Sequence, residues 1–175
     1  MYIKTRRCAF TIEIKEITWE NFWQVVDLKP SESQGKYLPS ISVFMSQAYV
    51  NLKLRYPDIC FALFNESQPV GFTKIVYVPK NVEPYYFLEN SYMIDAIMID
   101  AKYKGRGYGK EALYQVLNYI ESKPFGEADS IKLSCHDDNS VAINIYKKIG
   151  SYKTDKFSNK TEEFFIYSKD IKSTI

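Results

Sequence analysis

The chain has 175 residues, of which 46% are hydrophobic and 25% charged, with a formal net charge of +2. These values predict one globular domain over residues 1–175 with a sizeable core. The small net charge argues against a surface that holds a nucleic-acid backbone. The sequence contains no run of about 18 apolar residues, the length that a membrane-spanning helix requires, so we expect no such helix.

The N-terminal residues lack the apolar core of a signal peptide, so we expect a cytoplasmic protein without nucleic-acid or membrane partners. The three cysteines, Cys8, Cys60 and Cys135, follow no metal-binding spacing and cannot all pair with one another. We therefore expect reduced cysteines and no metal site.

Hydrophobic periodicity and turn-forming residues predict the elements of the first half of the chain. Thr18 is the expected N-cap of the first helix. The predicted elements are, in order, a strand at 10–17, a helix at 19–28, a loop at 29–36, a helix from about 40 to 55, and a hairpin of strands at 59–64 and 70–78.

The second half begins with an irregular stretch at 79–90 and continues with regular elements. These are a strand at 92–100, a helix after a glycine-rich turn, a strand at 130–135, a helix capped by Asn139 and ended by Gly150, and two strands within 151–168 turned at 158–159. The order β-α-α-β-β-β-α-β-α-β-β predicts an α/β chain: a mixed sheet with helices on both faces and a parallel crossover around the glycine turn.

The glycine-rich turn is the most informative segment. Gly105, Gly107 and Gly109 alternate at the start of a helix, where backbone can approach a ligand without a Cβ in the way. The free N–H groups of the first helical turn favour an anion. Three cations lie in the same segment: Lys104, Arg106 and Lys110. The segment therefore predicts a site for a ligand that carries a pyrophosphate.

Two well-known phosphate loops do not fit this spacing. A P-loop requires Ser or Thr after its lysine, whereas Glu111 follows Lys110. A dinucleotide fingerprint requires Gly-x-Gly-x-x-Gly near the start of a β-α-β unit. The segment Lys104–Gly109 instead resembles the acyl-CoA pyrophosphate loop of the GNAT N-acetyltransferases, with lysine where the family has glutamine or arginine. The order of strands and helices resembles the GNAT fold over nearly the whole chain.

A second segment resembles the family's other CoA-facing motif, Asn-x-x-Ala-x-x-x-Tyr-x-x-x-Gly. Here it is filled by Asn139, Ala142, Tyr146 and Gly150. Ala142 and Tyr146 are four residues apart and so share one helix face. The resemblance implies that Asn139 binds the pantetheine arm and that Tyr146 lies near the thioester sulfur, where its phenol can protonate the departing thiolate.

The resemblance also implies which residues hold acetyl-CoA, the acetyl donor. A backbone N–H on the strand before the glycine turn stabilises the oxyanion, with Ile97 or Met98 closest to the acetyl carbonyl. The full expected donor site is Ile97, Met98, Ile99, Lys104, Gly105, Arg106, Gly107, Tyr108, Gly109, Lys110, Asn139, Ala142 and Tyr146.

Asp95 is the candidate to receive the proton of the amine. It lies two residues before Ile97 and is expected on the same face of the strand. A carboxylate in an apolar strand needs a reason, because burying an unpaired charge is costly. Contact with a cationic amine is one explanation, and a buried ion pair or a solvent-exposed strand end is the other. The only histidine, His136, is expected to be structural.

Within the family the chain is similar to the bacterial spermine/spermidine acetyltransferases, through residues 94–110 and, more weakly, 26–40. This similarity implies a polyamine acceptor and places Glu32, Gln34 and Tyr37 over the acceptor site, with Glu83 and Asp95 able to attract a polycation. Glu83 and Glu89 otherwise read as solvent-exposed residues. Aminoglycoside-like antibiotics, streptothricin-type amines and protein amines remain alternative acceptors.

A non-catalytic CoA-binding sensor domain is the alternative of a different class. Tyr146 favours an active enzyme, since a domain without turnover has little need of a phenol at that position. The resemblance also implies a homodimer, because family members are often dimers, although no residue pattern marks an interface.

Overall fold

The computed structural model describes residues 11–54, 56–83, 85–158 and 163–171. Its elements are, in order, β1 (Ile12–Glu16), α1 (Phe22–Val26), α2 (Glu32–Gly35), α3 (Ile41–Lys53), β2 (Asp58–Asn65), β3 (Gln68–Val78), β4 (Ser91–Ile99), the 3-10 helix η1 (Ala101–Tyr103), α4 (Tyr108–Glu121), β5 (Ser130–Cys135), α5 (Ser140–Lys148), β6 (Tyr152–Ser158) and β7 (Glu163–Asp170). Cys8, the predicted strand start at 10 and the predicted turn residue 159 lie outside the described residues.

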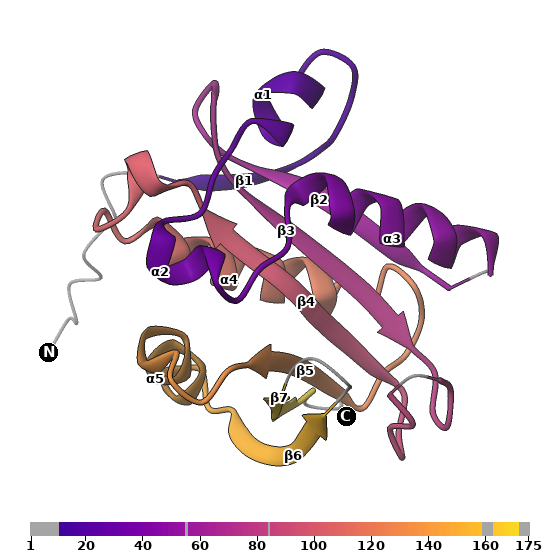
Figure 1. Ribbon diagram of the computed structural model, residues 1–175. Coiled ribbons are helices and arrows are strands. Elements are labelled where there is room, and N and C mark those ends of the chain that lie inside the picture. Colours follow the sequence, from indigo (N-terminus) through magenta and orange to yellow (C-terminus); the bar gives the residue numbers. More distant parts are fainter. Residues whose placement is uncertain (1–10, 55, 84, 159–162, 172–175) are drawn as a thin grey trace, which may run out of the picture.

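The strands form one seven-stranded sheet in the order β1-β2-β3-β4-β5-β7-β6 (Figure 1). Neighbouring strands are antiparallel except β4 and β5, which are parallel and are joined through α4. The predicted mixed sheet and its parallel crossover are thus confirmed.

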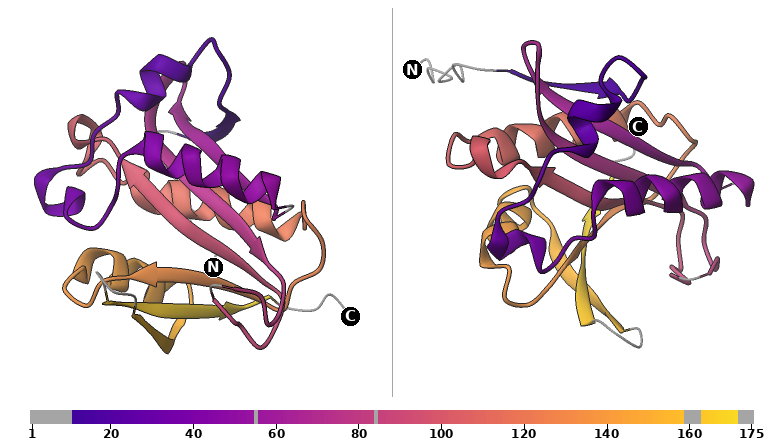
Figure 2. Two further views of the ribbon diagram at one scale, coloured as in Figure 1. Left: turned by 45° about the vertical axis from the view of Figure 1, so that its right-hand side comes forward. Right: turned by 45° about the horizontal axis from the view of Figure 1, so that its top comes forward.

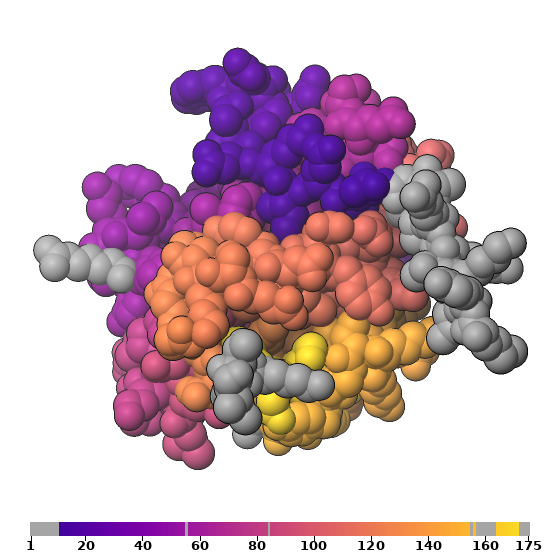
Figure 3. Space-filling view, turned by 180° about the vertical axis from the view of Figure 1, so that it is seen from behind, coloured from indigo at the N-terminus to yellow at the C-terminus, as the bar shows by residue number. Residues whose placement is uncertain are grey.

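Helices cover both faces of the sheet, as Figure 2 shows for α3 and α4. On one face, Val25 of α1 and Phe44 of α3 pack against Phe72, Ala96 and Met98. On the other face, α4 buries an apolar stripe at helical spacing, as the sequence predicts. That stripe is Ala112, Leu113, Val116, Leu117 and Ile120. Figure 3, viewed from behind, shows the outer surface of α4 lying between the N-terminal segments and the 140–158 region.

The sheet is split where the parallel pair ends. β4 pairs with β5 only from Ser91–Ser130 to Ile94–Leu133. Beyond Ile94 and Leu133 the two strands continue without pairing and move apart, as their carboxyl ends do in Figure 1. A β-bulge lies at this point, because Ile75 pairs with Ile94 and Lys74 with Ala96, which leaves Asp95 as the extra residue. At this opening, residues of β4 and β5 beyond the end of their ladder line one cleft.

Two predictions of local structure were wrong. The loop at 29–36 contains a single helical turn, α2, which has no buried residue and so leaves no apolar periodicity to detect. The first helix begins at Phe22 rather than Trp19, with Asn21 as its N-cap. Thr18 instead donates its N–H to Asn21 Oδ1 at 3.0 Å, closing the turn that precedes the helix. In the described part of the chain, no helix combines the length and apolar character needed to cross a bilayer.

Candidate active site

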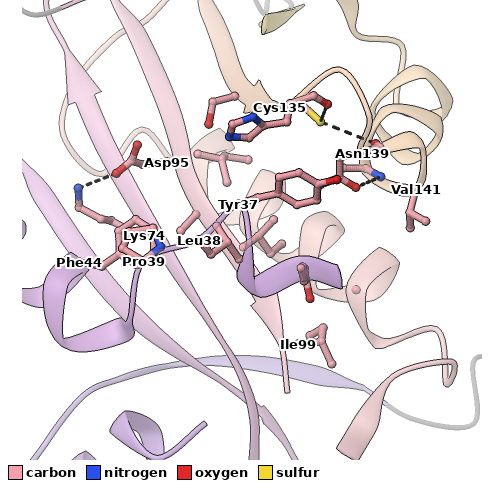
Figure 4. A pocket seen from close by; sticks show the side chains of 18 of the residues that line it. Tyr37, Leu38, Pro39, Phe44, Lys74, Asp95, Ile99, Cys135, Asn139 and Val141 are labelled. Atoms are coloured by element: carbon pink, nitrogen blue, oxygen red, sulfur yellow. Dashed lines mark hydrogen bonds and ion pairs between the residues drawn. The ribbon is translucent and has the colours of Figure 1, made fainter. Parts of the chain in front are cut away.

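The opening between β4 and β5 leads into a cleft of about 1360 Å³. It is lined by the carboxyl half of β4, the glycine turn, the start of α5, and the α2–α3 segment on the opposite wall (Figure 4). Pockets for a single drug-sized ligand usually occupy about 300–1000 Å³. The cleft therefore has room for a long ligand and for a second molecule beside it.

The glycine turn has the backbone conformation of an anion site. Gly107 is the N-cap of α4 with φ of 86°, and Gly105 has φ of 75°. A Cβ on Gly105 would meet nothing within 4 Å, so crowding does not explain the glycine. Its positive φ angle does, because that conformation is unfavourable for residues with a side chain. A Cβ on Gly109 would make only ordinary contact with Ile99, at 3.7 Å. The N-terminus of a 14-residue helix thus faces the cleft with its backbone uncovered.

Lys104 and Lys110 line the cleft beside this turn. The Lys104 ammonium donates to Ser31 Oγ at 2.5 Å, and burial lowers the pKa of Lys104. Arg106 does not line the cleft, and its guanidinium lies over the Tyr103 ring at 5.6 Å.

Asp100 anchors the turn, and sequence reasoning did not assign it a role. Its buried carboxylate accepts the Lys102 N–H at 2.8 Å, as the N-cap of η1, and the Lys29 N–H at 2.8 Å. It therefore ties the α1–α2 connection to the segment that holds the glycines. An aspartate directly after an apolar strand is the signal that could have identified this cap.

Helix α5 brings Asn139 and Tyr146 to the cleft as predicted. Asn139 Oδ1 accepts the Ala142 N–H at 3.2 Å, which caps the helix. Tyr146 is buried, packs edge-on against Tyr167 and donates to the Ser134 carbonyl at 3.4 Å. Burial raises the pKa of Tyr146, so its phenol stays protonated at neutral pH. The arrangement leaves a neutral hydroxyl at the wall of the cleft, which is what a proton donor requires.

Asp95 belongs to a buried ion-pair cluster. Lys74 Nζ lies 2.7 Å from Asp95 Oδ2 and 3.1 Å from Asp58 Oδ2, and Asn51 donates to Asp58 at 2.7 Å. The prediction that Asp95 shares a face with Ile97 was wrong, because the bulge turns its side chain toward Lys74 and α3, whereas Ile97 packs on the α4 side. Of the two explanations that the sequence left open, the structure shows the ion pair, at the edge of the cleft (Figure 4).

The charges in this cluster affect one another. Burial alone lowers the pKa of Lys74, but the two carboxylates outweigh it and raise that pKa overall. Burial raises the pKa of Asp58, against the opposing effect of Lys74. The pKa shift of Lys74 thus agrees with its position as an ammonium group between two carboxylates.

The two walls of the cleft touch through what we call the cross-cleft contact, made by Lys36 and Tyr37 with His136 and Asp138. The Tyr37 ring stacks on His136 with centroids 5.0 Å apart, and Lys36 Nζ lies 2.8 Å from Asp138 Oδ2. Figure 4 shows Tyr37 extending from its segment toward Asn139. The hydrogen bond from Lys36 lowers the pKa of Asp138. The α2–α3 segment is thereby joined to the turn between β5 and α5.

Most of the predicted site residues line this one cleft. They are Gln34, Tyr37, Asp95, Ile97, Ile99, Lys104, Gly105, Gly107, Tyr108, Gly109, Lys110, Asn139, Ala142 and Tyr146. Gln34 Oε1 is buried and has no hydrogen-bond partner among the described residues, which leaves an acceptor on the wall for a ligand. Lys74 and Asn51 also line the cleft and were not predicted.

Four predicted residues lie elsewhere: Glu32, Glu83, Met98 and Arg106. The Met98 side chain is buried under α1 and α3, which leaves only its backbone to serve the oxyanion role. Glu83 accepts a hydrogen bond from the Tyr86 hydroxyl, and Glu32 is exposed at the start of α2. Among the described residues, no three His, Cys, Asp or Glu side chains are grouped so that they could hold a metal ion.

Comparison with known proteins identifies the family. Residues 19–150 match the acetyltransferase (GNAT) family. The chain belongs to the GNAT family. It is 27% identical over 140 residues to the spermine/spermidine N(1)-acetyltransferase of Bacillus subtilis strain 168, which covers 80% of this chain and 87% of the relative.

Solved GNAT structures have the same fold. The ribosomal-protein-S18-alanine N-acetyltransferase of Escherichia coli superimposes with a TM-score of 0.65 at 16% identity, covering 94% of this chain and 96% of the other. The PaiA N-acetyltransferase of Thermoplasma acidophilum, in complex with coenzyme A, gives 0.61 at 16% identity, covering 92% and 99%. This GNAT chain is therefore an acyltransferase that uses acetyl-CoA as its acetyl donor.

Proposed function

We propose that this GNAT enzyme transfers the acetyl group to a primary amine of a small polyamine such as spermidine or spermine. The observation that carries the proposal is that the anion-binding turn, the protonated Tyr146 and the acidic Asp95 line one cleft, opened where β4 and β5 separate. Each supplies one thing that acetyl transfer to an amine requires.

The donor end of the cleft is the glycine turn. The N–H groups at the start of α4, with Lys104 and Lys110, bind the pyrophosphate of acetyl-CoA. The positive φ angles of Gly105 and Gly107 fit this role, because they aim backbone, not side chains, at the ligand. Asn139 and Ala142 hold the pantetheine arm, and the thioester supplies the activated acetyl group.

The reacting groups meet between β4 and α5. The amine nitrogen attacks the thioester carbonyl, and a backbone N–H between Ile97 and Ile99 stabilises the oxyanion that forms. The carbon–sulfur bond then breaks, and Tyr146 Oη gives its proton to the leaving thiolate. The proton that the amine gives up leaves through water, and the negative charge of Asp95 favours its departure without contact between the carboxylate and the reacting nitrogen. Holding the amine beside the thioester contributes much of the rate.

The polyamine acceptor is supported by the Bacillus subtilis relative and by the acceptor-side residues. Gln34 and Tyr37, on the α2–α3 side, line the same cleft as Asp95. Glu32 and Glu83 stay predictions as further contacts for a polycation. Protein amines are the second candidate, because two structural neighbours of the same fold are named as acetyltransferases of ribosomal proteins.

The test follows free thiol with acetyl-CoA and a panel of spermidine, spermine, aminoglycosides and short peptides, with mass spectrometry of the products. We expect thiol release with the polyamines and one acetyl group on each product. Release only with peptides would move the acceptor to protein amines. Binding of acetyl-CoA without thiol release from any amine would support the non-catalytic sensor domain instead.

A further inference from the structure

One group of cleft residues has no role in holding acetyl-CoA. It is the buried cluster of Asn51, Asp58, Lys74 and Asp95, which lies on the α3 side of the sheet and reaches the cleft through Asn51, Lys74 and Asp95. The bulge in β4 is what turns Asp95 into this cluster. The free-energy cost of removing buried charges from water often exceeds what their mutual attraction contributes to stability, so stability alone seldom explains a buried ion cluster. Its three cleft-lining residues lie where an acceptor molecule could contact them.

The cluster carries one net negative charge. Two carboxylates, Asp58 and Asp95, share a single ammonium, that of Lys74. The three charged groups also differ in burial. The side chains of Asp58 and Lys74 are 0% and 3% exposed, whereas that of Asp95 is 18% exposed. Asp58 Oδ1 is buried and has no hydrogen-bond partner among the described residues, so Lys74 does not satisfy both acids fully. Because Asp95 is the more exposed of the two acids, it is the one that an incoming cation can reach.

The surroundings of Asp95 suit an aliphatic cation. Phe44 lies 5.9 Å below the Lys74 ammonium, and it lines the cleft together with the half-buried Tyr85. Aromatic walls favour methylene groups and cations. The other acid of the cleft lining, Asp138, is already paired with Lys36 in the cross-cleft contact. Asp95 is also paired, with Lys74, but it shares that ammonium with Asp58. Within the described cleft it is therefore the acid whose charge is least neutralised by its partner.

We propose that Asp95 binds a second ammonium group of the acceptor, separate from the amine that is acetylated, and that Lys74 limits this subsite to one cation. The inference rests on the proposed function and names the part of the acceptor that is recognised. Asp95 and Ile97 both line the cleft, although the bulge turns their side chains to different faces of β4. A short acceptor with two nitrogen atoms, such as spermidine with its three- and four-methylene spacers, can therefore present one nitrogen to each.

The experiment compares three acceptors of one size that differ in the distal group: propane-1,3-diamine, 3-aminopropan-1-ol and 4-aminobutanoate. For each, kcat and KM are measured by thiol release at saturating acetyl-CoA. We expect kcat/KM for the diamine to exceed that of the amino alcohol by at least about tenfold, mainly through KM, with the carboxylate poorest. This comparison needs no substitution and so does not depend on how a variant folds.

Asp95→Asn then tests the residue itself. The amide oxygen can still accept from Lys74, so the cluster keeps its hydrogen bond, and the ratio of diamine to amino alcohol should fall to within about twofold of unity. Dividing the wild-type ratio by the variant ratio cancels the intrinsic reactivity of each amine. Glu121→Gln, which removes one exposed negative charge at the end of α4 outside the cleft, should leave the wild-type ratio unchanged.

The outcomes separate the two proposals. Equal kcat/KM for the diamine and the amino alcohol, or an unchanged ratio in Asp95→Asn, would overturn the subsite while leaving amine acetylation intact. A preference for 4-aminobutanoate would assign Lys74, and not Asp95, to the acceptor. Absence of transfer to every amine would overturn the proposed function and the subsite with it.

Discussion

Tyr146 is the residue on which the chemistry depends most directly. Its hydroxyl lies in the cleft wall with only a long bond, 3.4 Å, to the Ser134 carbonyl. A donor held so loosely can turn to a ligand at little cost, since hydrogen bonds weaken steeply with poor geometry.

Tyr146→Phe is expected to lower kcat by about 10²- to 10⁴-fold, the usual contribution of one positioned acid. The ring and its packing against Tyr167 remain, so acetyl-CoA affinity should change little. Steady-state kinetics with calorimetric measurement of CoA binding checks both. Loss of CoA binding in this variant would make Tyr146 structural.

Gly71 of β3 lies where the neighbouring strand β4 leaves no room for a side chain. A Cβ there would lie 2.3 Å from the Met98 carbonyl oxygen and 2.9 Å from Ile99 Cδ1, so β3 could not keep its distance from β4. Overpacking of this kind typically costs about 1–3 kcal/mol. We expect Gly71→Ala to lower the free energy of unfolding by that amount in denaturant titrations.

Gly35→Ala serves as the control for Gly71→Ala. The nearest atom to its Cβ is Pro30 Cγ at 3.5 Å, an ordinary contact, and the residue is helical. Its unfolding free energy should be unchanged or slightly higher, because alanine favours helix. Equal losses in both variants would mean that crowding between β3 and β4 is not the cause.

At the level of elements, the bulge in β4 shows where sequence reasoning stops. Alternation along one strand assigns Asp95 to the face of Ile97, but the register with β3 decides otherwise. Register is a long-range property, and no local pattern contains it. Lys74, the one charged residue of the largely apolar 70–78 segment, could have indicated the ion pair, because a buried lysine needs an acid from another part of the chain.

Most residues predicted for the donor half lie together in the cleft because that half is local, and their contact with acetyl-CoA stays a prediction. The glycine turn with α4, and Asn139 with α5, each lie within one short segment, where cap and helix face follow from spacing. The acceptor half draws on α2, α3, β3 and β4 together. That is why Lys74 and Asn51 were missed and why Glu32 and Glu83 were placed in a cleft that they do not line.

The cross-cleft contact couples the α2–α3 segment to α5. Asp138→Asn removes its ion pair with Lys36, and because both side chains are more than half exposed, stability should change little. We expect faster dissociation of CoA, by about two- to fivefold, measured by stopped-flow fluorescence. The control is Glu127→Gln, which removes an exposed pair with Lys123 outside the cleft. An unchanged rate in Asp138→Asn would show that the contact does not retain the ligand.

On the scale of the whole molecule, the α/β fold, with its mixed sheet and helices on both faces, was predicted from the order of elements and is confirmed. Periodicity is strong in the long elements, and the one parallel pair requires a crossover of the kind that α4 provides. One domain over residues 1–175 and a homodimer stay predictions.

The short parallel ladder has a mechanical consequence. Strands β1 to β4 and strands β5 to β7 are two antiparallel blocks, and the ladder between them is only four residue pairs long. We expect such a short ladder to act as a hinge and a ligand lying between the two blocks to restrict its motion. Acetyl-CoA should therefore slow amide hydrogen exchange at residues 130–133 of β5, although those residues lie beyond the region where the strands part. Protection limited to the glycine turn would mean that the two blocks are rigid without the ligand.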